Sequence, residues 1–424
     1  MVSRLSGPRS STDVGLLFAT RALRLFAYGL TSVVLALHLA AAGLSQLQIG
    51  LLLSLTLWGD TAISFLLTTR ADRAGRRRTL LVGAALMLAA AAVFATASSF
   101  WLLLLAATVG VLSPSGNEVG PFLAVEQAAL AQELPGERRT QVFAWYQLTG
   151  SFATALGALA GGGLVQLLQR AGVAPLTSYR AISVGYGLCG AGLALLFLGL
   201  SPGVEVTAPP ASAAPARASF LGLHRSRRVV LELSGLFALD AFAGGFVVQS
   251  LLAWWLHARF GASPAMLGAI FFGANVLAGL SALSAASIAR RIGLVNTMVA
   301  THLPSNVLLA LVPLMPTLPL AAALLLVRFS ISQMDVPTRQ SYTMAVVEPD
   351  ERSAAAGVTG IARTIGAAIS PVLAAPLYAS VALGGVPLFL AGGLKIVYDL
   401  LLWRRFRAVR PPEERIAAPA ARGG

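Results

Sequence analysis

Twelve charged side chains lie inside the long apolar stretches of this 424-residue chain. At about 2.5–3.5 kcal/mol each, facing lipid would cost the fold roughly 30–40 kcal/mol, whereas a typical protein is stable by only about 5–15 kcal/mol. These side chains must therefore pair with one another, line water, or do both. They are Arg21, Arg24, Asp60, Glu118, Glu126, Asp240, Arg328, Asp335, Arg339, Arg363, Lys395 and Asp399.

Three of the carboxylates, Asp60, Glu118 and Asp240, are suited to proton transfer. Burial disfavours a charged carboxylate, so a group of this kind can bind and release a proton as its exposure changes. We predict that at least one of the three carries a coupling proton. Lys395 and Asp399 are spaced i and i+4, so we expect them to pair locally.

Polar residues also recur at helical spacing, which places them on one face of a helix. Two readings stay open: such stripes line a substrate cavity, or they form salt bridges of a gate that never touches substrate. We assign Glu126 and Arg339 to a cytoplasmic gate pair. The stripes are Arg328, Ser332, Asp335, Arg339 and Tyr342, and Arg21, Arg24, Tyr28 and Ser32. With them we group Asp60, Asn117, Glu118 and Asp240 as cavity or proton-coupling candidates.

The composition requires these residues to be carried by membrane helices. Apolar residues make up 56% of the chain and charged residues 11%, against about 25% in an ordinary soluble protein. A soluble or an intrinsically disordered protein is thereby excluded. At about 20 residues per span, we expect an all-α integral membrane protein with twelve helices. The expected windows are 14–39, 47–69, 79–98, 101–131, 141–168, 180–200, 229–257, 265–288, 296–315, 320–346, 353–380 and 385–403.

The fourth window contains Ser113-Pro114-Ser115-Gly116-Asn117-Glu118 and then Pro121. Such a stretch either frees backbone groups for a ligand or is a simple kink, and we favour the kink. Within the first window, Arg21 and Arg24, the apolar run Leu25–Leu39 and then Ala40-Ala41-Ala42 resemble a signal peptide with a cleavage site. The window is longer than the usual core of such peptides, so we expect a span.

Arginine placement sets the orientation. Of the 30 Arg residues, 22 fall in loops and tails on one side and three, Arg170, Arg180 and Arg259, on the other. Because positive loops stay inside, we expect both termini and the linker in the cytoplasm, in the cytoplasmic membrane. The net charge of +14 therefore indicates orientation in a lipid bilayer and no nucleic-acid partner.

The two halves look like copies. At an offset of 218, Gly43, Ser45 and Gly50 match Gly261, Ser263 and Gly268, and Arg73, Gly75 and Thr79 match Arg291, Gly293 and Thr297. These residues sit at corresponding hairpin corners. We expect two pseudo-symmetric six-helix bundles, residues 1–200 and 229–403, with a cytoplasmic linker at 201–228 and a disordered tail at 404–424.

The loop Asp72-Arg73-Ala74-Gly75-Arg76-Arg77-Arg78 could be only a positive-inside turn. It also resembles the D-R-x-G-R-R signature of the major facilitator superfamily, with Thr68 where the signature usually opens with Gly. The resemblance implies the major facilitator fold, with helices 1, 4, 7 and 10 lining a central cavity. It also implies that Asp72, supported by Arg73, Gly75, Arg76 and Arg77, latches the halves on the cytoplasmic side.

Gly157-Ala158-Leu159-Ala160-Gly161-Gly162 looks like the antiporter motif G-P-x-x-G-G of that family, with Ala158 in place of proline. Close packing of small residues explains Gly157, Gly161 and Gly162 equally well. If the motif is functional, it favours export.

The sequence contains no phosphate-binding loop and no zinc or triad motif, so we expect no cofactor and no metal. The resemblance implies a secondary active transporter and not an enzyme. We expect it to move a small organic solute by alternating access, driven by protons, as a monomer, with export of drugs or amphiphiles favoured. Two alternatives are uptake of an organic anion and a polytopic membrane enzyme acting on a lipid-linked substrate.

Overall fold

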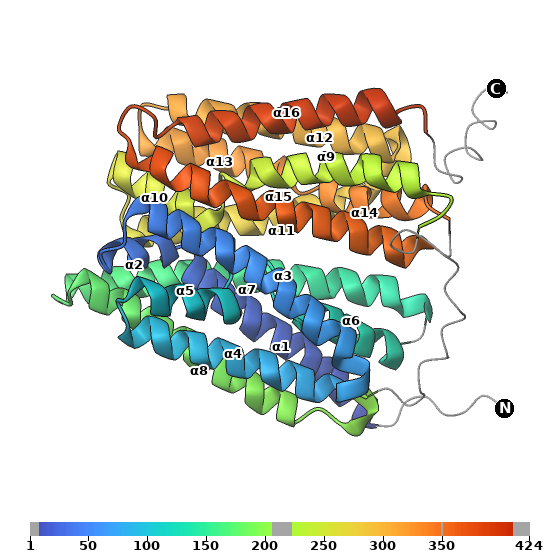
Figure 1. The fold of residues 1–424 in the computed structure, drawn as a ribbon, viewed down its shortest axis with the longest axis horizontal. Helices are drawn as coiled ribbons and strands as arrows, with labels where there is room; N and C mark the ends of the chain where they lie inside the picture. Colours follow the sequence, from blue (N-terminus) through green and yellow to red (C-terminus); the bar gives the residue numbers. More distant parts are fainter. Residues whose placement is uncertain (1–7, 135, 206–222, 349–350, 410–424) are drawn as a thin grey trace. The chain divides into compact units, whose positions relative to one another are not determined.

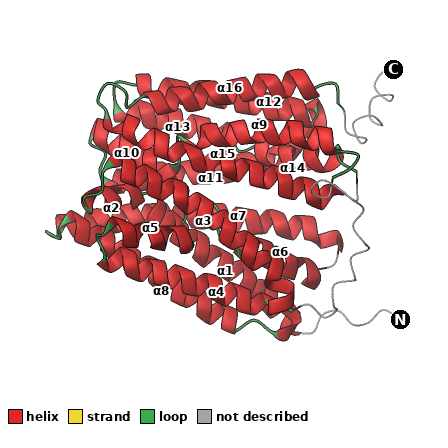
Figure 2. Cartoon of the chain, in the orientation of Figure 1, coloured by secondary structure: helices red, strands yellow, loops and turns green. Residues whose placement is uncertain are grey.

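The computed structural model describes residues 8–134, 136–205, 223–348 and 351–409 (Figure 1). Most of the predicted linker and tail, and the side chain of Asp72, lie outside the described residues, so the predictions made for them stay predictions. Helices joined by loops make up the described chain (Figure 2).

The described residues form sixteen α-helices. The first eight are α1 (Pro8–Ser32), α2 (Leu35–Ala41), α3 (Gln46–Ala74), α4 (Arg76–Thr96), α5 (Phe100–Val109), α6 (Phe122–Glu133), α7 (Gly136–Arg170) and α8 (Pro175–Leu198). The others are α9 (Arg227–Gly245), α10 (Gln249–Phe260), α11 (Pro264–Ile292), α12 (Leu294–Leu311), α13 (Leu318–Ser332), α14 (Asp335–Ala345), α15 (Arg352–Ala379) and α16 (Val386–Phe406). Two short 3₁₀ turns cover Pro202–Val204 and Val312–Leu314.

Eleven stretches of the described chain are long and apolar enough to cross a membrane, some of them built from two consecutive helices. The chain is therefore a multi-pass membrane protein. The expected window 101–131 is not one helix with a kink. It divides into α5 and α6 with twelve non-helical residues, 110–121, between them, so the simple kink was wrong.

The repeated hairpin corners have a glycine with positive φ in both halves. Gly43 and Gly261 have φ of 87° and 65°, and Gly75 and Gly293 have φ of 101° and 86°. Positive φ at these corners explains why glycine recurs there, because other residues rarely adopt it.

The side chains that follow these glycines also act alike. Thr79 and Thr297 donate hydroxyl hydrogen bonds to the carbonyl oxygens of Gly75 and Gly293, at 3.0 and 2.7 Å. Ser45 and Ser263 each accept from the backbone N–H three residues later, at 3.3 Å. The sequence repeat is thus a repeat of local structure.

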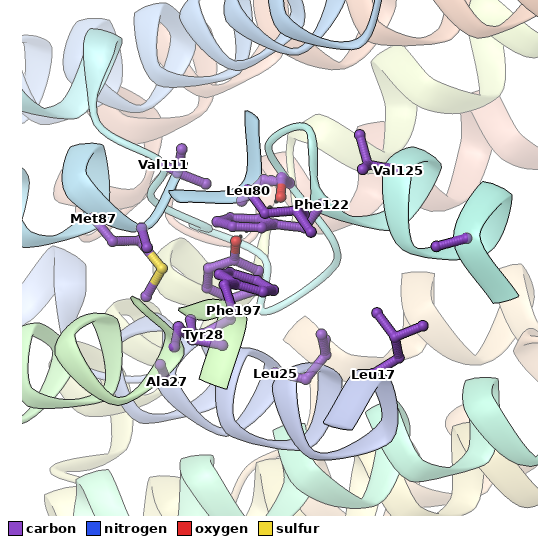
Figure 3. Close-up of a cluster of buried hydrophobic side chains, with 14 of the residues drawn as sticks. Leu17, Leu25, Ala27, Tyr28, Leu80, Met87, Val111, Phe122, Val125 and Phe197 are labelled. Atoms are coloured by element: carbon purple, nitrogen blue, oxygen red, sulfur yellow. Dashed lines mark hydrogen bonds between the residues drawn. The ribbon is translucent and has the colours of Figure 1, made fainter. Parts of the chain in front are cut away.

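The chain divides into two compact units. Unit 1 comprises residues 1–211 and 248–276, and unit 2 comprises residues 212–247 and 277–424. In the core of unit 1, Tyr28, Phe122 and Phe197 are fully buried, and the rings of Phe122 and Phe197 stack with centroids 5.9 Å apart (Figure 3). In unit 2, Phe237, Met298 and Tyr342 belong to a separate buried cluster.

Candidate functional site

The non-helical stretch between α5 and α6, called here the 110–121 segment, leaves backbone carbonyls without helical partners. Inside a bilayer such groups must be satisfied by the protein. Tyr186 of α8 donates to the carbonyl of Val111, and Tyr28 of α1 donates to that of Val119 at 3.1 Å. Thr154 donates to the carbonyl of Gly116 at 3.4 Å. Hydroxyls from three helices therefore hold the segment in place.

Asp60 of α3 binds the C-terminal end of the same segment. Its Oδ1 accepts from the backbone N–H of Gly120 at 2.5 Å and from the hydroxyl of Ser64 at 3.3 Å. Among the described side chains, no Lys, Arg or His lies within salt-bridge distance of Asp60. No described side chain donates a hydrogen bond to its Oδ2 either. Asp60 is thus a carboxylate with neutral partners and a free oxygen.

Glu118, in the 110–121 segment, belongs to an ion-pair network with α1. Arg24 donates from Nε to Glu118 at 2.7 Å and from both Nη atoms to Glu126 of α6, each at 2.7 Å. Arg21 donates to Glu118 at 2.9 Å and also bonds to Gln147 of α7. Two arginines and two glutamates balance each other, which makes their burial tolerable.

Neutral and aromatic groups complete this network. Glu126 also accepts from the hydroxyls of Thr20, at 2.8 Å, and Tyr146. The guanidinium of Arg24 lies 4.7 Å from the ring centroid of Phe122. Neither Arg24 nor Glu126 is exposed, whereas the side chain of Glu118 is 14% exposed. The network is therefore closed at Arg24 and Glu126, and it reaches open space at Glu118 and at Gln147, which is exposed.

Unit 2 has its own buried ion pairs. Asp240 of α9 accepts from Lys395 of α16 at 2.5 Å and from Arg339 of α14 at 3.2 Å, and Arg339 also pairs with Asp335 at 3.1 Å. The local pair that we predicted between Lys395 and Asp399 was wrong. The ammonium group of Lys395 pairs with Asp240 on a neighbouring helix, and i, i+4 spacing cannot predict a contact between two helices.

Asp399 instead binds α12. It accepts from His302 Nδ1 and from Asn306 Nδ2, each at 2.9 Å, and its side chain is fully buried. Sequence reasoning missed His302 and Asn306, as it missed Gln147 and Tyr146 of the other network. A lone His or Asn in an apolar run gives no pairing signal, because its partners are about a hundred residues away.

Two arginines, one buried and one half-buried, have no carboxylate partner among the described residues. Arg328 of α13 is 9% exposed, its Nε is unpartnered, and its guanidinium lies 4.8 Å from the ring centroid of Phe329. Arg363 of α15 is half-buried and makes no ion pair with the described chain. Both lie within electrostatic reach of Asp240 and Asp335.

The structure thus brings together most of the predicted cavity residues, in two groups. Arg21, Arg24, Glu118 and Glu126 form one, and Asp240, Asp335 and Arg339 form the other. Tyr28 is fully buried and holds the 110–121 segment, while Asn117 is exposed. Glu126 and Arg339 each have partners inside their own unit, so the gate pair stays a prediction.

The predicted arginine-rich loop is a corner in which Gly75 alone separates α3 from α4, and the start of α4 anchors the chain that follows α8. The backbone N–H groups of Arg76 and Arg77 donate to the carboxylate of Glu205, at 2.7 and 3.1 Å. A carboxylate at the N-terminus of α4 is also favoured by the helix dipole. Arg73 is exposed. The latch that we predicted for Asp72 lies outside the described side chains.

The three glycines of the antiporter-like motif lie at close helix contacts. A Cβ on Gly157 would lie 2.0 Å from the carbonyl oxygen of Phe26, and one on Gly161 would lie 2.3 Å from that of Leu30. One on Gly162 would lie 2.1 Å from that of Pro264. These glycines therefore let α7 pack tightly against its neighbours, as small residues do in other membrane helices.

Comparison with known proteins decides the family. The model of the Major Facilitator Superfamily matches residues 17–371. The chain belongs to the major facilitator superfamily. As a member it is a transporter of some solute and not an enzyme, which removes the alternative of a membrane enzyme acting on a lipid-linked substrate.

The chain is also similar to a yeast membrane protein and to two solved structures of transporters. The chain is 32% identical over 427 residues to the uncharacterized membrane protein YJR124C of Saccharomyces cerevisiae, covering 94% of this chain and 95% of the other. A bacterial homologue of the human lysosomal transporter Spinster, inward-facing and occupied, matches with TM-score 0.71, 17% identity and coverage of 96% and 99%. The D323A mutant of the nucleoside transporter NupG matches with TM-score 0.71, 14% identity and coverage of 92% and 100%. These structures share the fold.

Proposed function

We propose that the chain is a proton-driven secondary transporter that moves a small organic solute by alternating access. In this proposal α5 and α6 together make a twelfth, discontinuous span, and residues 1–200 and 229–403 form two six-helix bundles. The arginine distribution supports both termini in the cytoplasm and a place in the cytoplasmic membrane. The protein is proposed to work as a monomer.

One observation carries the assignment of the proton: the free Oδ2 of Asp60. Both donors to Asp60, Gly120 and Ser64, bond to Oδ1, so a proton can bind Oδ2 without breaking either bond. Glu118 and Asp240 differ, because each is paired with two cations and protonation would break charge-assisted hydrogen bonds. Of the three predicted carboxylates, we propose Asp60 as the residue that exchanges the coupling proton.

Asp60 also links proton binding to a segment that can move. Its bond to Gly120 lies two residues from Glu118, the partly exposed member of the ion-pair network. Neutralising Asp60 weakens its hold on the Gly120 N–H, because hydrogen bonds to an ionised acceptor are about twice as strong as neutral ones. In this way protonation would loosen the 110–121 segment.

The test begins with finding a solute. Expressing cells are grown on panels of toxic compounds and sole carbon sources, and hits are checked by thermal shift of the purified protein. In proteoliposomes with a pH gradient, Asp60→Asn should abolish uphill transport of that solute and keep exchange down its own gradient. Glu232→Gln, which alters a partly exposed carboxylate paired with Arg228 and Arg405, serves as the control and should keep both. Full gradient-driven transport by Asp60→Asn would overturn the assignment.

Export is the proposed direction, supported by the likeness of Gly157, Gly161 and Gly162 to the antiporter motif. Close packing also accounts for these glycines, so orientation must be measured. In inside-out vesicles an exporter accumulates the solute when the vesicle interior is acidified. Accumulation only in right-side-out vesicles would show uptake instead.

A second candidate is transport of an organic anion, favoured by the two unpaired arginines. Arg328 and Arg363 place positive charge near the ion pairs of Asp240 with no carboxylate of their own among the described residues. A carboxylate or phosphate group on the solute would complete them. Arg328→Gln should then weaken binding of anionic hits at least tenfold and leave binding of neutral hits unchanged. Equal effects on both classes would reject an anionic solute.

A further inference from the structure

Beyond Asp60, we propose that His302 is a second proton-binding site, inside unit 2, and that its protonation transfers Asp240 from Lys395 to His302. The proposal rests on proton-coupled transport as the function, and it adds the group that makes α9 respond to the proton. It concerns four side chains on three helices: Asp240 on α9, His302 on α12, and Lys395 and Asp399 on α16.

The hydrogen bonds of His302 assign its tautomer. Nδ1 lies 2.9 Å from Oδ1 of Asp399 and 3.1 Å from the Asn306 amide nitrogen, which in turn lies 2.9 Å from Oδ2 of Asp399. An amide nitrogen can only donate, so Asn306 satisfies Asp399, and Nδ1 carries the hydrogen that Oδ1 accepts. The neutral imidazole is thereby left with its acceptor on Nε2, and Nε2 is where a proton must bind.

Nε2 faces a carboxylate oxygen that is already in use. It lies 3.8 Å from Oδ1 of Asp240, and the same Oδ1 accepts from Lys395 Nζ at 2.5 Å. Without a proton, Nε2 and Oδ1 are two acceptors facing each other, which explains their separation beyond hydrogen-bond distance. With a proton, Nε2 becomes a donor and competes with Lys395 for the same oxygen. A movement of about 1 Å closes the gap to an ordinary hydrogen bond.

The other charged and aromatic groups around His302 and Asp240 keep their positions when His302 gains a proton. Oδ2 of Asp240 is held by Arg339, which also pairs with Asp335, and the ring of Tyr398 lies edge-on to His302 with centroids 5.9 Å apart. Arg328 and Arg363 act on Asp240 at longer range. His302 is 4% exposed and Asp399 is not exposed, so a new proton on His302 is stabilised by these carboxylates and not by bulk water.

The step balances simply. A proton from water forms an N–H bond at Nε2, and the Nδ1 hydrogen stays in its bond to Asp399. Lys395 leaves Oδ1 of Asp240 with all three of its protons. The result is that α9 exchanges an ion pair with α16 for one with α12. The charge state of one imidazole thus determines which of these two helices binds Oδ1 of Asp240, while Arg339 of α14 keeps Oδ2.

The chain offers a direct measurement, because it contains only four histidines. A variant with His38→Gln, His224→Gln and His257→Gln keeps His302 alone, and ¹³C labelling of the ring gives one NMR signal for the full chain in lipid nanodiscs. That signal should change between the neutral and imidazolium forms as pH is varied from 5 to 9. Lys395→Met removes the competitor and should tighten proton binding at least tenfold, moving the midpoint to higher pH.

A second variant guards against misfolding of the first. Asp399→Asn removes the acceptor of the Nδ1 hydrogen and should weaken proton binding at least tenfold, whereas Arg228→Gln, at an exposed pair, should leave the titration unchanged. A His302 signal that stays neutral from pH 5 to 9, or that ignores both substitutions, overturns the proposal. No transported solute is needed, so this failure is distinct from retention of gradient-driven transport by Asp60→Asn.

Discussion

Arg24 and Glu126 are joined by two parallel hydrogen bonds of 2.7 Å each, and neither side chain is exposed. The pair connects α1 to α6, the helix that follows the 110–121 segment. Such bidentate pairs are the strong form of an arginine–carboxylate interaction. The folding of unit 1 around the 110–121 segment therefore depends on this pair.

Removing one partner should destabilise the protein strongly, because it strands a buried charge. We expect Glu126→Leu to lower the free energy of unfolding by about 3–5 kcal/mol. Arg24→Lys should be destabilising too, since an ammonium group cannot bridge two carboxylates as the planar guanidinium does. Unfolding of the purified protein in mixed detergent micelles measures both.

The control for this pair is the exposed ion pair of Arg228 and Glu232, whose arginine is 83% exposed. Arg228→Gln should cost less than about 1 kcal/mol, as exposed pairs usually do. A Glu126→Leu protein as stable as this control would show that the buried pair does not hold α1 and α6 together.

The tyrosines that satisfy the 110–121 segment give a second prediction. Tyr186→Phe and Tyr28→Phe each leave a buried carbonyl, of Val111 or Val119, without its donor, at a cost of about 1–3 kcal/mol. We expect faster hydrogen–deuterium exchange in residues 110–121, measured by mass spectrometry. Tyr179→Phe, on the same helix as Tyr186, has no bond to this segment in the described chain and should leave its exchange unchanged. Unaltered exchange in both test variants would mean that other contacts fix the segment.

Much of the fold could be predicted because it follows from local rules. Apolar windows located the helical stretches, although four of them, 14–39, 101–131, 229–257 and 320–346, each hold two helices. The offset of 218 found corners that share positive φ and a threonine hydroxyl bonded to the carbonyl of the corner glycine. The break at residues 110–121 was visible as a run of Pro and Gly. The length of this non-helical segment could not be predicted, because the segment depends on hydroxyls from α1, α7 and α8 that replace the lost helical hydrogen bonds.

The candidate site was harder to predict, because burial forces charges to pair without fixing the partner. The twelve charges were identified, yet Lys395 pairs with Asp240, 155 residues away, and not with Asp399. His302 gave no signal at all. Its partners can be recognised only in the structure, where α9, α12 and α16 place two aspartates beside one imidazole. Sequence spacing shows which residues share one face of one helix, whereas each of these clusters combines side chains from three helices.

The shared corners predict equal sensitivity at Gly75 and Gly293. An alanine at either position must adopt positive φ with extended ψ, a region that is nearly restricted to glycine, at a cost of about 1–3 kcal/mol. We expect Gly75→Ala and Gly293→Ala to lower the free energy of unfolding by similar amounts. Gly393, in α16 and with open space where a Cβ would lie, is the control and should tolerate alanine. A large difference between the two corner variants would contradict their structural equivalence.

The glycines of α7 separate packing from function within one helix. A Cβ at Gly157 or Gly161 would lie 2.0 or 2.3 Å from a backbone oxygen of α1, whereas one at Gly163 has nothing within 4 Å. Backbone cannot yield as a flexible side chain can, so Gly157→Ala and Gly161→Ala should separate α1 from α7 and lower the unfolding temperature. Gly163→Ala should be neutral or stabilising by up to about 1 kcal/mol, through helix propensity. If Gly157→Ala folds with unchanged stability but transports in the opposite direction, the motif controls direction and packing is not its main role.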